Sequence, residues 1–284
     1  MNKKLIGVLL LVLAGTVTFT TAQDLNFADA LSRLERTINQ AEEEFTLQDS
    51  YFLGRTTAAF ILNRYPLFTE NQGLIVYLNL ICNALAINSR APNWYNGYQV
   101  MILDDLSINA FSTPGGHIFI TRGLIELSSS EDMLAAIIAH ELAHIQLNHG
   151  TSDIMQNRII ANFAQERQRI SHNLARETRQ EMFSLSINEM IQKLFSGGYS
   201  QLQEFEADLW AFNLLASTGY NPASLLELLR ILERIQGNQI TSLNASHPLP
   251  TQRIANLERN IPSFRRFADN SSFRTDRFKI IMER

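Results

Sequence analysis

Residues 128–150 read SSSEDMLAAIIAHELAHIQLNHG, and this stretch decides the fold of the region around it. Its serines offer an N-cap, and the two acids that follow suit the positive end of a helix dipole. Residues 133–147 are strongly apolar, and Gly150 after them is the type of residue that closes helices. We therefore predict a buried helix here.

His140, Glu141 and His144 are nearly the only polar groups of this helix between Asp132 and Gln146. Residues four apart share one helical face, so both imidazoles can hold one ion while the glutamate faces the attacking water. Zinc lowers the pKa of a water, and a carboxylate within reach can take its proton and pass it to the leaving amine. Without partners, burial of the three groups would cost roughly several kcal/mol, and a metal removes that cost. The spacing predicts a zinc-dependent endopeptidase; the alternative is two histidines that bond to neighbouring backbone.

A catalytic zinc also needs a third protein ligand and an open position. Glu204 and Asp208 are four apart on a predicted helix, where two carboxylates repel unless a cation or a histidine N–H takes them up. We assign Glu204 to the metal and Asp208 to the orientation of a ligand histidine. The alternative is a solvated acidic face, with Glu206 pointing the other way to the surface.

Four motifs follow one another along the chain. They are Asn109-Ala110-Phe111-Ser112 with Pro114-Gly115-Gly116-His117-Ile118-Phe119-Ile120, then His140-Glu141-Leu142-Ala143-His144, then the segment from Glu204 to Asp208, and His247-Pro248 followed by Arg253-Ile254. With these motifs in this order, the chain resembles the M48 metallopeptidases over about residues 49–259. The family includes prenyl-protein proteases and HtpX-like proteases of membranes as well as soluble periplasmic proteases, and the chain is similar to the last group.

The resemblance implies a gluzincin with one Zn²⁺ per chain, in which Glu204 is the third ligand beside His140 and His144. It also implies that His247 and Arg253 approach the metal, where each can stabilise the tetrahedral oxyanion. His247 can instead occupy the open coordination site in a resting state. The alternatives are a loop-capping histidine and a surface arginine.

The resemblance further implies that Asn109, Ala110 and Phe111 form a sheet edge that binds an extended polypeptide substrate as an added strand. Such an edge recognises a substrate through main-chain hydrogen bonds, so we expect unfolded or misassembled proteins of the bacterial cell envelope as substrates. The rival function is a latent or chaperone-like binding module with a gated zinc site, which the intact Glu141 disfavours.

The predicted fold class is α+β, a mostly helical zincin-like domain with a small antiparallel β-sheet beside the HExxH helix. Helical spacing predicts helices over 51–64, 71–87 and 201–217, and a final helix follows the proline-bracketed loop near His247. Short apolar runs predict strands at 99–103, 107–111 and 117–121, with a Pro-Gly-Gly turn before the last.

We predict four segments: a signal peptide at 1–22, an N-terminal helical segment at 23–48, the peptidase domain at 49–260 and a C-terminal tail at 261–284. The first has the charged, apolar and small-residue zones of a cleavable signal, which indicates export to the periplasm. The alternative is an uncleaved membrane anchor. The charged stretch 151–196 is expected to form a lid or docking element over the cleft.

The charge and the cysteine content of the chain limit which partners and cross-links we expect. The net charge of −4 without a basic stripe argues against nucleic acid, and we expect no membrane span after signal cleavage, with peripheral contact to envelope proteins. Cys82 is the only cysteine and is expected in the core. We expect His149 to cap a helix end, and His117 and His172 to be structural or solvated.

Overall fold

A computed structural model describes residues 47–152, 188–194, 198–236, 247, 250–260 and 272–283, all within the compact unit Ala41–Arg284. The expectations for the signal peptide, for residues 23–46 and for residues 153–187 with His172 lie outside the described residues. In chain order the elements are α3 (Leu47–Arg64), α4 (Gln72–Ile87), β1 (Gln99–Leu103), β2 (Ala110–Ser112), β3 (His117–Thr121), α5 (Arg122–Leu127), α6 (Glu131–Gln146), α9 (Gln201–Thr218), α10 (Ala223–Gln236), α12 (Pro250–Asn260) and α13 (Ser272–Met282).

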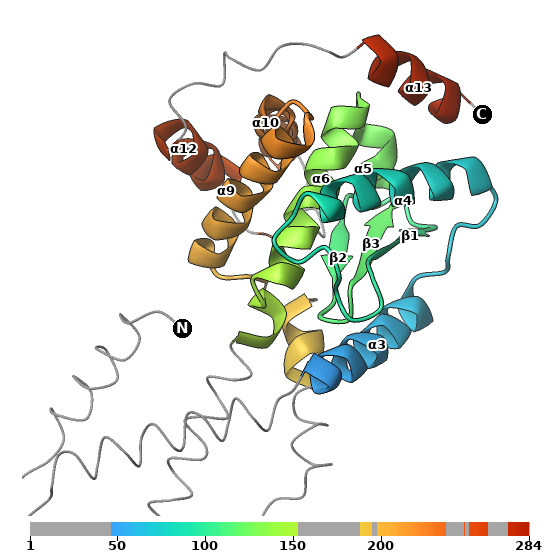
Figure 1. The fold of residues 1–284 in the computed structure, drawn as a ribbon, viewed down its shortest axis with the longest axis vertical. Helices are drawn as coiled ribbons and strands as arrows, with labels where there is room; N and C mark the ends of the chain where they lie inside the picture. Colours follow the sequence, from blue (N-terminus) through green and yellow to red (C-terminus); the bar gives the residue numbers. More distant parts are fainter. Residues whose placement is uncertain are drawn as a thin grey trace, which may run out of the picture. The chain divides into compact units, whose positions relative to one another are not determined.

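Helix α6, which carries the HExxH sequence, lies between the sheet and a group of helices. On one side it contacts α4, β2 and β3, and on the other it contacts α9 and α10, with α12 packed against the last two (Figure 1). The α+β fold class is confirmed. Among the described helices, none combines the length and the hydropathy that a bilayer-spanning segment needs.

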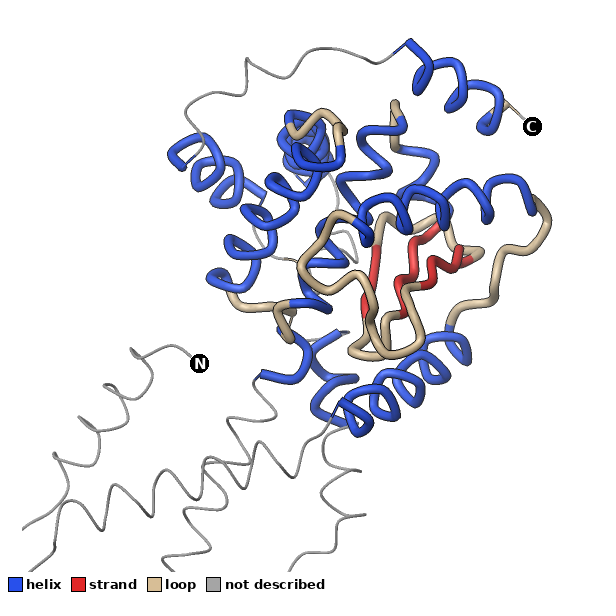
Figure 2. The backbone as a smooth tube through the Cα atoms, viewed as in Figure 1, coloured by secondary structure: helices blue, strands red, loops and turns tan. Residues whose placement is uncertain are grey.

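The sheet has three strands in the order β1-β3-β2, seen side by side in Figure 2. β2 pairs antiparallel with β3, but β1 pairs parallel with β3, so the expectation of an entirely antiparallel sheet is wrong. The reason is strand order: the turn at 113–116 returns the chain from β2 into the middle of the sheet, and β1 lies on the far side of that returning strand. The predicted strand at 107–111 is observed at Ala110–Ser112.

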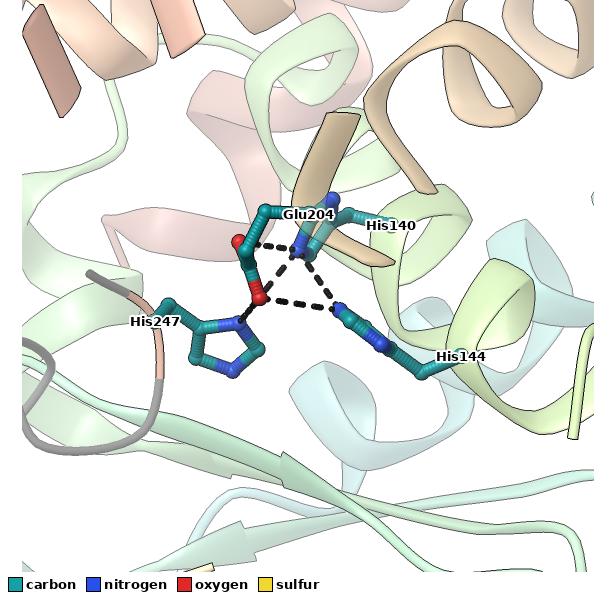
Figure 3. A group of neighbouring side chains, drawn as sticks. All are labelled: His140, His144, Glu204 and His247. Carbon is teal, nitrogen blue, oxygen red and sulfur yellow. Dashed lines mark hydrogen bonds and ion pairs between the residues drawn. The ribbon is translucent and has the colours of Figure 1, made fainter. Parts of the chain in front are cut away.

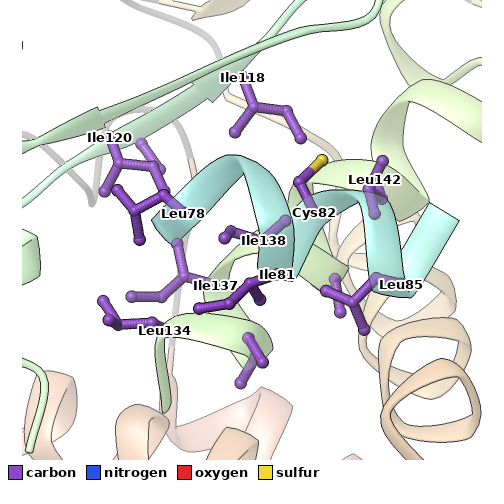
Figure 4. Packing of buried hydrophobic residues seen from close by; sticks show 14 of the residues in the cluster. Leu78, Ile81, Cys82, Leu85, Ile118, Ile120, Leu134, Ile137, Ile138 and Leu142 are labelled. Atoms are coloured by element: carbon purple, nitrogen blue, oxygen red, sulfur yellow. The ribbon is translucent and has the colours of Figure 1, made fainter. Parts of the chain in front are cut away.

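The core forms where α4 and β3 pack on the apolar face of α6. Each fully buried leucine or isoleucine there contributes roughly 1.5–3 kcal/mol of hydrophobic free energy. Figure 4 shows Leu78, Ile81, Cys82 and Leu85 of α4, Leu134, Ile137, Ile138 and Leu142 of α6, and Ile118 and Ile120 of β3. Cys82 is fully buried, which confirms its predicted place in the core.

Local signals fix both ends of α6. The Ser130 hydroxyl accepts a hydrogen bond from the Met133 N–H (3.2 Å), as an N-cap does. After the helix ends, Asn148 adopts a left-handed φ of 57°, a conformation that asparagine tolerates better than most residues. The chain therefore changes direction two residues after α6 ends.

Candidate metal centre

Helix α6 brings His140, Glu141 and His144 to one buried position, with exposed fractions of 6%, 2% and 1%. The two imidazoles lie one turn apart and meet edge to face, with ring centroids 4.7 Å apart. Their Nε2 atoms are 3.1 Å apart and point into the same small space (Figure 3).

Glu204 reaches this space from the first turn of α9. Ser200 begins that helix with a capping box, in which its hydroxyl accepts from the Gln203 N–H and the Gln203 side chain accepts from the Ser200 N–H. Glu204 Oε1 lies 3.4 Å from His144 Nε2, and Oε2 lies 3.5 Å from His140 Nε2. The capping box thus fixes the helix start that carries the third predicted ligand.

His247 completes the cluster from the segment before α12. Its Nδ1 lies 2.9 Å from Glu204 Oε1 and 3.4 Å from His140 Nε2, and its Nε2 lies 3.5 Å from Glu141 Oε1. His140, His144, Glu204 and His247 each offer one ligand atom, all within 4.8 Å of one another, and all four residues are buried (Figure 3).

Asp208 and Arg253 surround this cluster. Asp208 Oδ1 lies 3.1 Å from His140 Nδ1, the arrangement that its predicted orienting role requires. The Arg253 guanidinium donates to Asp208 from Nε (2.8 Å) and Nη2 (2.6 Å), and its Nη1 lies 2.8 Å from Glu204 Oε2. The structure brings all the predicted catalytic and metal-binding residues together, and their roles stay predictions.

The charges of the cluster do not balance within the described residues. Three buried carboxylates, those of Glu141, Glu204 and Asp208, face the guanidinium of Arg253 and the ring of His140, whose pKa is raised to about 9. One negative charge is then in surplus when the other imidazoles are neutral. Glu141 Oε2 has no hydrogen-bond partner in the described part of the chain. Buried charges are costly unless paired, and two imidazoles with one carboxylate are a ligand set of catalytic zinc. The residues present therefore fit a divalent metal.

The protonation states of Glu204, Asp208 and His144 agree with this fit. Burial alone would raise the pKa of Glu204, but nearby His247 and Arg253 and hydrogen bonds from both other histidines lower that pKa well below its ordinary value. The pKa of Asp208 is likewise lowered, because Arg253 outweighs burial. Burial holds the pKa of His144 well below its ordinary value. Glu204 and Asp208 are thus ionised and His144 is neutral, as metal ligation requires. Burial and Arg253 lower the pKa of His140, but hydrogen bonds to Asp208 and Glu204 raise it to about 9, so a metal would have to displace a proton from this ring.

The family model described as Peptidase family M48 matches residues 76–261, more than half of the chain. The chain belongs to this family. Metalloprotease LoiP of Escherichia coli (strain K12) is 28% identical over 182 residues, which are 63% of this chain and 68% of LoiP. Metalloprotease YcaL of the same organism is 23% identical over 166 residues, 58% of this chain and 62% of YcaL. The Beta-barrel assembly-enhancing protease of Escherichia coli (strain K12) is 23% identical over 235 residues, which are 81% of this chain and 46% of that protease. The chain thus spans from under half to about two thirds of these relatives.

This M48 chain has its predicted substrate-binding residues, Asn109, Ala110 and Phe111, at or beside the outer strand β2. All three are buried, and the Ala110 N–H donates to Asn109 Oδ1 (2.9 Å). Hydrogen bonds to β3 are made at residues 109 and 113, where the Thr121 N–H donates to the Asn109 carbonyl (3.1 Å) and the Thr113 N–H donates to the His117 carbonyl (2.9 Å). The alternation of an antiparallel ladder therefore directs the main-chain groups of Ala110 and Ser112 away from β3. A substrate strand at this edge stays a prediction.

Two residues beside His144 have positions that were not predicted. Tyr199 stacks on the His144 ring, with centroids 3.7 Å apart and planes at 18°. His149 was expected to cap a helix end, but it is buried, with its Nδ1 3.0 Å from His144 Nδ1. The capping prediction is wrong because the left-handed Asn148 turns His149 back toward the M48 site. An asparagine just after the helix was the one available signal of this turn.

Proposed function

We propose that this chain is a zinc-dependent endopeptidase of the bacterial cell envelope that hydrolyses peptide bonds in unfolded or misassembled proteins. The observation that carries the proposal is the buried set of ligand atoms within 4.8 Å of one another, beside a Glu141 carboxylate oxygen without a partner among the described residues. A purely structural site has no use for that carboxylate, because its ligands fill every coordination position.

His140, His144 and Glu204 would hold one Zn²⁺ per chain. When bound, zinc lowers the pKa of a water and polarises the carbonyl of the scissile bond. Glu141 takes the proton of the attacking water and returns it to the leaving amine, and such a positioned base contributes roughly 10²–10⁴-fold to the rate. Its buried position excludes competing hydrogen bonds from bulk water.

The neighbouring side chains orient and donate. Asp208 accepts from His140 Nδ1 and so leaves Nε2 of that ring for the metal. Arg253 already bonds two carboxylates, so of the two predicted oxyanion donors His247 is favoured, and Arg253 serves to hold Glu204 and Asp208 in place.

The proposed substrate is an extended polypeptide that pairs with the outer edge of β2, along the stretch of Asn109, Ala110 and Phe111, where the main-chain groups of Ala110 and Ser112 point away from β3. A strand-pairing edge recognises backbone, which unfolded proteins expose and folded proteins do not. A relative named for enhancing β-barrel assembly and the predicted signal peptide support a periplasmic location, with peripheral contact to envelope proteins. The net charge of −4 supports the exclusion of nucleic acid.

Replacement of the base tests the proposal. Glu141→Gln keeps the shape of the side chain, so the zinc content and the melting temperature should stay at wild-type values while casein cleavage slows by about 10²-fold or more. The matched control is Glu126→Gln in α5, where the side chain is 57% exposed. This variant should cleave casein at the wild-type rate. A Glu141→Gln protein as fast as wild type would refute the assignment of the base.

The position of His247 favours a second candidate, a latent or chaperone-like binding module with a gated zinc site. Its Nδ1 is one of the clustered ligand atoms, where it would fill the coordination position that catalysis keeps open. His247→Ala separates the two readings: faster casein cleavage than wild type indicates a gate, and slower cleavage indicates an oxyanion donor. If wild type and His247→Ala both bind casein without cleaving it, the binding module is the better account.

A further inference from the structure

We infer that His149 is a positioning residue for the metal site: it accepts a hydrogen bond from His144 Nδ1–H and so holds Nε2 of that ring toward the metal. The inference deepens the proposed function and rests on it for the presence of a metal. It does not depend on peptidase activity.

The two nitrogen atoms of His144 face different surroundings. Nε2 points into the ligand cluster, 3.1 Å from His140 Nε2 and 3.4 Å from Glu204 Oε1. Nδ1 points the other way and lies 3.0 Å from His149 Nδ1. A neutral imidazole that ligates through Nε2 carries its proton on Nδ1, and the nitrogen at 3.0 Å is then the acceptor.

The same proton placement defines the tautomer of His149. With Nδ1 as acceptor, the neutral ring carries its own proton on Nε2. Glu206 Oε2 lies 3.4 Å from that nitrogen, slightly beyond an ideal hydrogen bond, on a side chain that is 65% exposed. The exposed Glu206 carboxylate thus lies beside Nε2, the nitrogen of His149 that carries the proton in this tautomer.

The backbone around His149 is held firmly in place. Asn148 supplies the left-handed turn that brings residue 149 toward His144. The His149 carbonyl then accepts from Lys193 Nζ (2.7 Å) and from Gln203 Nε2 (3.4 Å). Because the His149 side chain is only 4% exposed, its ring has little freedom to leave the contact with His144.

The two histidine ligands therefore have different outer partners. His140 Nδ1 meets the buried carboxylate of Asp208 at 3.1 Å, whereas His144 Nδ1 meets the imidazole of His149. Tyr199 additionally stacks on the His144 ring, which restricts its tilt but offers no acceptor to Nδ1 through that face. Loss of an outer partner of a ligand histidine typically weakens metal binding 10–100-fold.

Zinc affinity of the full chain, measured by competition with a chromophoric chelator, tests the inference. His149→Ala should weaken zinc binding by about 10–100-fold. His149→Asn should recover most of the affinity, because the asparagine Oδ1 takes the place of Nδ1, whereas His149→Gln places its amide at the Nε2 position and should stay weak. The visible spectrum of the Co²⁺-loaded proteins should follow the same order. His117→Ala is the control, since His117 Nδ1 contacts Thr113 Oγ1 (3.0 Å) and not the cluster.

Equal zinc affinities for His149→Asn and His149→Gln would overturn the inference, as would wild-type affinity in His149→Ala. If His149→Ala does not fold, the comparison of the asparagine and glutamine variants decides alone. If the variants follow the predicted order of zinc affinities but the wild-type chain cleaves nothing, the inference is supported and the proposed function is refuted. A purely structural role would lower the melting temperature of all three variants without this order.

Discussion

The two ends of α6 both bury charged side chains, but the protein neutralises only one of the two groups. At the N-terminal end, Glu131 pairs with Arg277 and Asp132 pairs with Arg274, both from α13. At the other end, Glu204 and Asp208 share the guanidinium of Arg253, and the third buried carboxylate, Glu141, has no arginine partner among the described residues. A balanced buried network stabilises the fold, whereas a network with surplus charge of one sign indicates a site that receives a partner.

The oxygens of the N-terminal group are also fully used. Glu131 accepts from Tyr77 Oη at 2.7 Å and from Tyr220 Oη at 3.3 Å, in addition to Arg277. Asp132 accepts from the Asn221 N–H at 2.8 Å. Both acids also lie at the positive end of the α6 dipole. Nothing here requires a metal, in contrast to Glu141 with its unpartnered oxygen in the described part of the chain.

The largest expected effect comes from removing the surplus charge at the metal end. Glu204→Gln should reduce zinc from one per chain to near zero and slow casein cleavage by about 10³-fold, because several kcal/mol of metal-derived stabilisation is lost. Metal analysis and melting with and without EDTA measure this. Chelation should lower the melting temperature of wild type and leave that of the variant unchanged. If Glu204→Gln retains one zinc per chain, the idea that this end of α6 binds a metal through Glu204 is wrong.

The reciprocal change at the balanced end should affect stability and leave metal binding intact. Glu131→Gln removes the charge that Arg277 pairs with and weakens an acceptor for two tyrosines, so the free energy of unfolding should fall by about 2–3 kcal/mol. Urea denaturation gives this value, and zinc content should stay at one per chain. The exposed Glu126→Gln serves again as the control. Loss of zinc in Glu131→Gln with the fold retained would show that the two ends are not separate in function.

The α6 pattern was readable from the sequence because its signals are local. Cap, apolar run and HExxH spacing lie within one stretch, and the predicted helices at 71–87 and 201–217 agree with α4 and α9 within one residue at each end. The strands at Gln99–Leu103 and His117–Thr121 were likewise predicted. Strand order is a long-range property, so the parallel pairing of β1 with β3 could not be read from those runs. No helix was predicted over Ala223–Gln236, where the structure has α10.

The site residues likewise fall into those that local spacing predicts and those that it cannot. The i and i+4 spacing led to His140 and His144, and a second such spacing led to Glu204 and Asp208. The position of His149 depends on one left-handed residue, which spacing along an ideal helix cannot reveal. The arginine partners of the acids in the first turn of α6 come from α13, far along the chain, and no local pattern connects the two segments.

The smallest expected effect tests whether acceptor capacity, and not charge alone, makes the N-terminal group structural. Burial and the hydrogen bond to Glu131 raise the pKa of Tyr77, so its hydroxyl stays protonated and donates. Tyr77→Phe should cost about 1–2 kcal/mol of unfolding free energy, and Tyr220→Phe should cost less, because its hydroxyl lies 3.3 Å from the carboxylate instead of 2.7 Å. In the Glu131→Gln background the cost of Tyr77→Phe should shrink, which a double-mutant cycle measures. If Tyr77→Phe is neutral in both backgrounds, the ion pairs with α13 alone hold this end of the helix, and charge balance by itself separates the two ends of α6.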